Sequence, residues 1–194
     1  MTRRSDVRPM AYGLAGLLAF SAAASAETDA PMPTSVATSA RCDVWARELS
    51  FARSVAEHDA AAFRAHLHTG AVFGVGRDRQ TRGGDAIAQR WAGIVEGKAI
   101  TIEWYPTHTV ESAEAPGVAW SSGPSLVIEN PSAADARYSI GTFHSVWHRG
   151  DDGVWRVLFD DGADSRPADA EQVRAFRAGR REACPESPVT PPSA

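Results

Sequence analysis

The stretch Asp151–Gly162, DDGVWRVLFDDG, decides the fold class of this chain. Its opening Asp-Asp-Gly is typical of a tight turn, and the VWRVLFD that follows has the β-branched and aromatic content of a strand. Residues 137–149 before the turn read as a strand too, so the two segments predict an antiparallel hairpin. The hairpin ends on two adjacent carboxylates, Asp160 and Asp161, which makes its end a candidate site.

Two registers are open for this hairpin. A two-residue loop pairs His148 with Trp155, whereas a three-residue turn with Gly153 in a left-handed bulge position pairs Arg149 with Trp155. Burying a large apolar side chain contributes about 1.5–3 kcal/mol, so we favour the second register, which turns the more apolar face and Asp161 inward. The side chains expected on that face are Phe143, Ser145, Trp147, Trp155, Val157, Phe159 and Asp161.

The residues before the hairpin predict three helices and further strands. Apolar residues recur at helical spacing from Trp45 to Ala56 and from Ile87 to Val95, and a shorter helix capped by Asp59 is expected between them. A short strand is expected at residues 71–75. From residue 99 apolar residues alternate with a period of two, which is typical of strands. The expected strands are residues 99–110, 118–129, 137–149 and 154–160, and a short final helix is expected to lead to Cys184.

The long strand beginning at residue 99 has one largely apolar face. Pro106 within the run indicates a bend or an edge position. The residues expected on the apolar face are Ile100, Ile102, Trp104, His108 and Val110.

The chain begins with the features of an export signal. Three arginines within residues 3–8 precede an uncharged run over residues 10–24, and Ala24-Ser25-Ala26 supplies the small residues of a cleavage site. The uncharged run is shorter than the roughly 20 residues that span a bilayer. We therefore expect cleavage after Ala26, a periplasmic or secreted protein, and no membrane attachment after cleavage.

Composition divides the remainder of the chain. Residues 27–40 are small, polar and proline-containing and predict a linker, residues 41–184 form the expected domain, and residues 185–194 predict a disordered tail. In an oxidising compartment, Cys42 and Cys184 are best interpreted as an intramolecular disulfide. Two free thiols or an intermolecular bridge are the alternatives.

Charge and histidine spacing argue against two classes of partner. The predicted signal removes three Arg and one Asp from 20 basic and 24 acidic residues, which leaves 17 and 23, a net charge of −6 that is unsuited to nucleic acid. His66 and His68 diverge on a helix, and His144 and His148 lie about 13 Å apart at about 3.3 Å per strand residue. We expect no metal ion and no cofactor.

Two kinds of side chain are candidates for a functional site. A carboxylate at the mouth of an apolar cavity has a raised proton affinity and can act as a general base, which points to Asp161 and Asp160; the alternative is that both cap a turn or face solvent. His108, beside Trp104, can act as an acid, a base or a hydrogen-bond donor, or it is a core histidine. The residues expected to contact a ligand are Trp104, Trp120, Phe143, Ser145 and Trp147.

The order of these pieces resembles the nuclear transport factor 2-like superfamily, the fold shared by ketosteroid isomerase and the SnoaL-like polyketide cyclases. Within it, the chain is similar to the bacterial SnoaL-like domains of unassigned function. The resemblance covers about residues 44–162. The pieces that carry it are EHDAAAFRAHL (57–67), AVFGVG (71–76), RGGDAIAQRW (82–91), Trp104-x-Pro106, SVWHR (145–149) and DDGVWRVLFDDG (151–162).

The resemblance implies an α+β domain: a cone-shaped, curved, mixed or antiparallel sheet wrapped around three helices, with a short C-terminal helix. It also implies a pocket at the wide end and frequent homodimers, but no particular reaction. Ketosteroid isomerases carry a catalytic Tyr in the first helices, whereas Tyr12, Tyr105 and Tyr138 all fall outside the helices of this domain. A steroid isomerase is therefore disfavoured.

Three functions follow from the sequence. The first is an exported SnoaL-like domain that binds a small, partly apolar ligand in an aromatic-lined pocket. The second is an isomerase, cyclase or dehydratase with Asp160 or Asp161 as general base. The third is a non-catalytic scaffold that forms a homodimer through its sheet.

Overall fold

The computed structural model describes residues 34–186. The chain divides into two units, Met1–Met32 and Pro33–Ala194, and only the second contains described residues. The predicted signal peptide, residues 1–26, and most of the predicted tail, residues 185–194, lie outside the described part. No helix within that part is long and apolar enough to cross a membrane.

The elements follow the predicted order. The helices of the described residues are α1 (Thr34–Ala56), α2 (Ala60–His66), α3 (Gly84–Glu96) and α4 (Ala170–Ala178). The strands are β1 (Leu67–Phe73), β2 (Thr81–Arg82), β3 (Ile100–Trp104), β4 (His108–Glu111), β5 (Val118–Glu129), β6 (Arg137–Arg149) and β7 (Trp155–Pro167). Helix α1 begins at Thr34, within the segment that composition predicts as a linker.

Local capping explains where the helices begin and end. Asp59 accepts a hydrogen bond from the Ala62 N–H at 2.8 Å and starts α2, as its sequence position predicts. Asp169 and Gln172 form a reciprocal capping box at the start of α4. Gly97 follows α3 with φ 67°, a left-handed conformation that ends a helix most easily at glycine.

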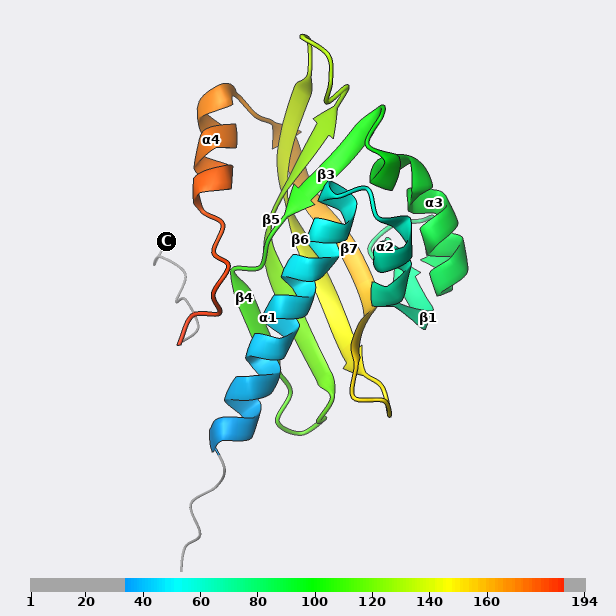
Figure 1. Ribbon diagram of the computed structural model, residues 1–194, viewed down its shortest axis with the longest axis vertical. Helices are drawn as coiled ribbons and strands as arrows, with labels where there is room; N and C mark the ends of the chain where they lie inside the picture. Colours follow the sequence, from blue (N-terminus) through cyan, green and yellow to red (C-terminus); the bar gives the residue numbers. More distant parts are fainter. Residues whose placement is uncertain (1–33, 187–194) are drawn as a thin grey trace, which may run out of the picture. The chain divides into compact units, whose positions relative to one another are not determined.

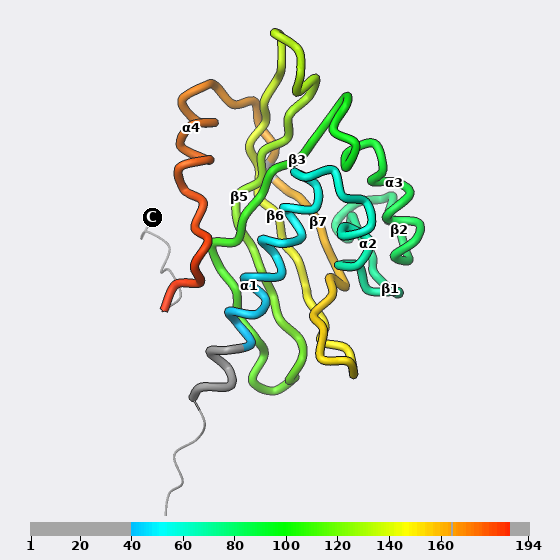
Figure 2. The backbone as a smooth tube through the Cα atoms, viewed as in Figure 1, coloured from blue at the N-terminus to red at the C-terminus, as the bar shows by residue number. Residues whose placement is uncertain are grey.

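A single mixed sheet carries the domain. Its strand order is β2-β1-β7-β6-β5-β3, with β4 also paired to β5. Strands β1 and β7 are parallel and the other pairs are antiparallel. The sheet curls strongly, with α1 running along it and α2 and α3 beside it (Figures 1 and 2). The predicted α+β class, with a curved sheet wrapped around three helices and a short C-terminal helix, is confirmed.

Helix α1 supplies the centre of the main core. Val44, Phe51 and Val55 are nearly fully buried and pack with Trp147 and Trp155 of the hairpin. Complete burial of side chains this large contributes about 1.5–3 kcal/mol each, which holds the helix against the curved sheet.

A second cluster and a disulfide fix the C-terminal helix. Val173 and Phe176 of α4 pack with Trp45 of α1 and with Tyr105, whose hydroxyl donates to the Phe176 carbonyl at 2.7 Å. Cys42 and Cys184 form a disulfide with a Cα–Cα distance of 5.4 Å, as predicted. The bond links α1 to the segment that follows α4.

The predicted hairpin register is confirmed at the turn. Arg149 pairs with Trp155, and Gly153 has φ 75°. Further along, Trp147 pairs with Val157 but Val146 pairs with Phe159, so Leu158 is an extra residue in a β-bulge.

The bulge exchanges the two faces of β7 from Phe159 to Ala163, after which a second register shift follows. Phe159 is 39% exposed, and Asp160 lies opposite Ser145 on the inner face. The prediction that Phe159 and Asp161 share the inner face with Trp147 is therefore wrong, because a one-residue insertion turns every later side chain over.

The predicted long strand over residues 99–110 is broken in two. Trp104 pairs with Ser125 and His108 with Ser122, so four steps on one side match three on β5. The extra residue reverses the alternation: Thr109 is buried, while Val110 is 54% exposed. The expectation that His108 and Val110 share the apolar face of Trp104 is wrong for this reason.

Candidate functional site

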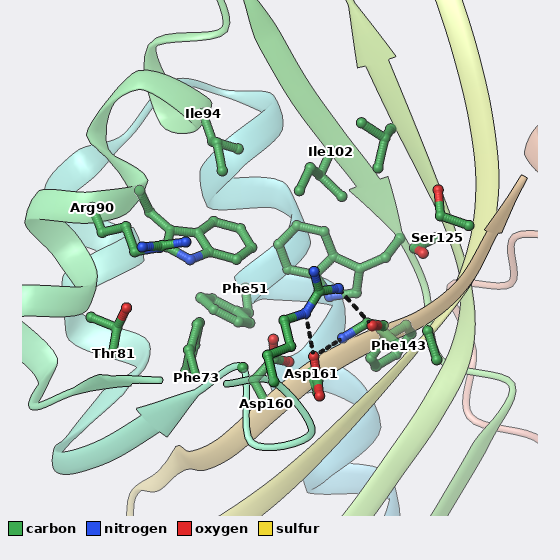
Figure 3. Close-up of a pocket in the computed structure, with 18 of the residues that line it drawn as sticks. Phe51, Phe73, Thr81, Arg90, Ile94, Ile102, Ser125, Phe143, Asp160 and Asp161 are labelled. Atoms are coloured by element: carbon green, nitrogen blue, oxygen red, sulfur yellow. Dashed lines mark hydrogen bonds and ion pairs between the residues drawn. The ribbon is translucent and has the colours of Figure 1, made fainter. Parts of the chain in front are cut away.

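A cavity of about 460 Å³ lies between the curved sheet, α1 and α3. Its walls come from α1, β1, the loop between β1 and β2, α3 and strands β3, β5, β6 and β7. The aromatic rings that line it are Phe51, Phe73, Trp91, Trp104 and Phe143. Figure 3 shows Phe51, Phe73 and Phe143 around the hollow, with Asp160 and Asp161 in the middle of strand β7, which continues to Pro167 instead of ending at Asp160.

The aromatic walls support one another. The Phe51 and Trp104 rings meet edge to face with centroids 5.2 Å apart, and Phe73 meets Trp91 in the same way at 5.6 Å. The Trp91 and Trp104 rings are 6.4 Å apart. Such pairs add about 0.5–1.5 kcal/mol beyond their burial, so the walls are fixed before any ligand arrives.

A fully buried carboxyl group, Glu48, lies behind the cavity wall. Its Oε1 accepts from Trp104 Nε1 at 2.7 Å, and its Oε2 accepts from Trp147 Nε1 at 2.8 Å and from Ser121 Oγ at 2.5 Å. Burial raises the pKa of Glu48 above its ordinary value, although the hydrogen bonds from these donors and from Ser145 act in the opposite direction.

Sequence reasoning missed Glu48, yet a signal was present. Val44, Glu48, Phe51 and Val55 fall at i, i+4, i+7 and i+11, one buried stripe of a helix. A carboxyl group within such a stripe must find hydrogen-bond donors inside the protein, since an unpaired buried charge is costly. The two indole N–H groups are those donors.

Asp160 is the carboxyl group that meets the cavity from the inner face of the sheet. Its Oδ2 accepts from Ser145 Oγ at 2.8 Å. Burial raises the pKa of Asp160 well above its ordinary value, and the nearby acids Glu48 and Asp161 raise it further. The residue is half-buried and lines the cavity.

Asp161 lines the same cavity, but its carboxylate has different hydrogen-bond partners and a lowered pKa. It accepts from the Gly76 N–H at 2.7 Å and from Arg77 Nε at 3.2 Å. Partial burial acts to raise its pKa, but these hydrogen bonds outweigh that effect and hold the pKa below the ordinary value. Arg77 also donates to the Gly162 carbonyl at 2.9 Å, so its guanidinium is held both by the Asp161 carboxylate and by the backbone of β7.

The structure brings some of the predicted ligand residues together. Trp104 and Phe143 line the cavity. Ser145 and Trp147 do not line the cavity but lie behind its wall. Ser145 donates a hydrogen bond to Asp160, and Trp147 donates one to Glu48.

Two predicted site residues lie elsewhere. Trp120 is 38% exposed, stacks on His144 with centroids 5.8 Å apart, and is not among the residues that line this cavity. His108 contacts Thr107 Oγ1 at 3.0 Å and is not among the residues that line the cavity. No three His, Cys, Asp or Glu side chains of the described residues come together as a metal site.

Several solved structures have the same fold as this domain. A nuclear transport factor 2-like superfamily protein from Salmonella enterica serovar Typhimurium aligns with a TM-score of 0.54 and 14% identity, over 69% of this chain and 94% of that one. The chain has the nuclear transport factor 2-like fold. The resemblance stated from the sequence is confirmed at the level of the fold. The sequence matches no protein-family model and no curated protein.

Other proteins with the nuclear transport factor 2-like fold align equally well. A hexachlorocyclohexane dehydrochlorinase from Novosphingobium barchaimii gives a TM-score of 0.53 and 15% identity, over 68% of this chain and 92% of its own. A ketosteroid isomerase-like protein from Erwinia carotovora gives 0.52 and 14%, over 63% and 92%. At these identities the likeness establishes the fold alone, and function has to be argued from the site.

Proposed function

We propose that this domain, exported by its N-terminal signal, binds a small and partly apolar molecule in the aromatic-lined cavity. The observation that carries the proposal is a hollow of about 460 Å³ walled by five aromatic rings and a few polar side chains. Ligand pockets are typically about 300–1,000 Å³, mostly apolar, with few orienting polar groups.

The polar groups of the lining can orient the ligand through hydrogen bonds. Asp160, with its raised pKa, is protonated over a wider pH range than an ordinary Asp and can donate a hydrogen bond to a ligand oxygen. Ser145 holds its other oxygen in place. A molecule with an apolar body and at least one oxygen fits this combination.

Proton-transfer catalysis is the second candidate, and the same carboxyl group favours it. A raised pKa brings a carboxyl group nearer to the working pH, where it transfers protons most effectively. In an isomerase, cyclase or dehydratase, Asp160 would take the proton from a substrate carbon. Asp161 is a poorer base because its hydrogen bonds lower its pKa. Among the structural neighbours, the dehydrochlorinase is named for an elimination reaction, which is compatible with such a step.

Native mass spectrometry tests the binding proposal. The protein is isolated without denaturation from the organism that makes it, alongside an Ala163→Phe variant that narrows the cavity and an Ala113→Phe control in an exposed loop. We expect the wild type and the control to retain a small molecule that Ala163→Phe loses. An empty wild-type protein that is wholly dimeric would contradict binding and favour the scaffold.

Asp160→Asn separates binding from catalysis. If the protein only binds, the variant keeps the retained molecule and its affinity changes little. If it catalyses proton transfer, the variant keeps the molecule but stops converting it.

A further inference from the structure

The cavity is lined by more basic than acidic side chains. The charged side chains that line it are Arg77, Arg79, Arg90, Asp160 and Asp161. The whole chain has a net charge of −4, so this excess of arginine is a local feature of the cavity.

Neither aspartate neutralises the remaining arginines. Asp161 is paired with Arg77 at 3.2 Å. Asp160 is bonded to Ser145, and its raised pKa favours the uncharged form. Two positive charges at the cavity are therefore left uncompensated by the lining, those of Arg79 and Arg90.

These two arginines approach the cavity from different elements. Arg79 belongs to the loop between β1 and β2, and Arg90 to α3, next to the cavity ring Trp91. Both are exposed, so they lie where the cavity opens to solvent (Arg90 is labelled in Figure 3). Among residues 34–186, neither guanidinium has an ion-pair or hydrogen-bond partner.

We infer that the ligand carries a carboxylate, which Arg79 and Arg90 bind at the mouth while the apolar body of the ligand fills the aromatic cavity. The inference rests on the proposed binding function. Guanidinium groups bind carboxylates through paired, charge-assisted hydrogen bonds, and they are weakly hydrated, which suits a half-open site. Aromatic walls alone also suit a cation, but two unpaired arginines repel one.

Calorimetric titration with three naphthalene probes tests this directly. The probes are 2-naphthoate, 2-naphthamide and 2-naphthylmethylammonium, which have nearly the same apolar body and differ in charge. We expect naphthoate to bind at least about tenfold tighter than naphthamide, and the ammonium probe to bind most weakly. The preference should shrink between 0.05 and 0.5 M salt, since the arginines are exposed.

Matched variants locate the effect. The double variant Arg79→Gln/Arg90→Gln should bind naphthoate no better than naphthamide. The control Arg174→Gln/Arg181→Gln removes the same charge from exposed positions that do not line the cavity and should keep the preference. Thermal unfolding of each variant checks that the fold is intact. If a double variant does not fold, the single substitutions Arg79→Gln and Arg90→Gln replace it.

The outcomes separate the two proposals. Equal binding of naphthoate and naphthamide by the wild type, or a preference that survives in the Arg79/Arg90 variant, overturns the carboxylate inference and leaves cavity binding standing. Absence of binding for all three probes at millimolar concentration overturns both.

Discussion

Replacing Glu48 with glutamine tests whether the cavity wall depends on a buried carboxyl group. Glu48 accepts from two indole N–H groups, and its second oxygen also contacts the Ser121 hydroxyl. Protonated Glu48 keeps all of these bonds, because its hydroxyl can donate to Ser121 while accepting from Trp147. A glutamine NH₂ cannot accept, so either Trp104 or Trp147 is left with a buried, unsatisfied N–H.

The expected loss in the free energy of unfolding is about 1–3 kcal/mol, the cost of one buried unsatisfied donor. This loss depends on pH in a fixed direction. The pKa of Glu48 is raised in the folded state, so its stabilising contribution is complete below the unfolded pKa and is lost as pH rises through the folded pKa. Glutamine does not titrate, and the difference between wild type and Glu48→Gln therefore shrinks as pH rises.

Urea unfolding followed by tryptophan fluorescence and far-UV circular dichroism measures both effects between pH 4 and pH 9. The control is Glu57→Gln, the same substitution at an exposed position just after α1, which should change stability by less than about 0.5 kcal/mol. If Glu48→Gln loses no more stability than Glu57→Gln at every pH, the hydrogen-bond network behind the cavity is not as described.

Three further predictions rest on the structure, and a fourth rests on the sequence of the N-terminal signal. Asp160→Asn removes a carboxyl group whose pKa is raised in the folded state, and such a group loses its stabilising contribution as pH rises. The unfolding temperature of the variant relative to that of the wild type should therefore increase between pH 5 and pH 9, and a constant difference would contradict the assigned pKa direction. Opening the disulfide with Cys42→Ser/Cys184→Ser should cost about 5 kcal/mol in urea unfolding by the loop-entropy estimate for a separation of 142 residues, and an unchanged midpoint would contradict it. If the sheet forms a homodimer through its exposed face, Trp120→Ser should lower the mass found by light scattering, whereas an equal mass for both proteins argues against that face. Intact mass of the exported protein should match a chain cleaved after Ala26, and a retained N-terminus would contradict export with cleavage.

Much of the fold was accessible from the sequence because its signals are local. Helical spacing in α1 and α3, the cap at Asp59 and the Gly153 turn each act within a few residues. These signals predicted the order of elements and the register at the hairpin turn. The disulfide followed from having only two cysteines in the chain and a predicted oxidising compartment.

The two errors in strand alternation share one physical cause. Leu158 and the turn between Trp104 and His108 each add one residue against a neighbouring strand, and each addition turns the following side chains to the other face. Such insertions are set by pairing between distant segments, so strand alternation alone does not reveal them. The Leu158 bulge is the reason that Asp160, and not Asp161, lies opposite Ser145 on the inner face.

Fluorine NMR of protein labelled with 5-fluorotryptophan tests most directly whether the hollow is a ligand site. The chain has six tryptophans; Trp91 and Trp104 line the cavity, while Trp120 lies on the exposed face. On addition of 2-naphthoate, the signals of Trp91 and Trp104 should shift while that of Trp120 stays in place. A shift confined to Trp120, or six unmoved signals at saturating probe, would contradict the account.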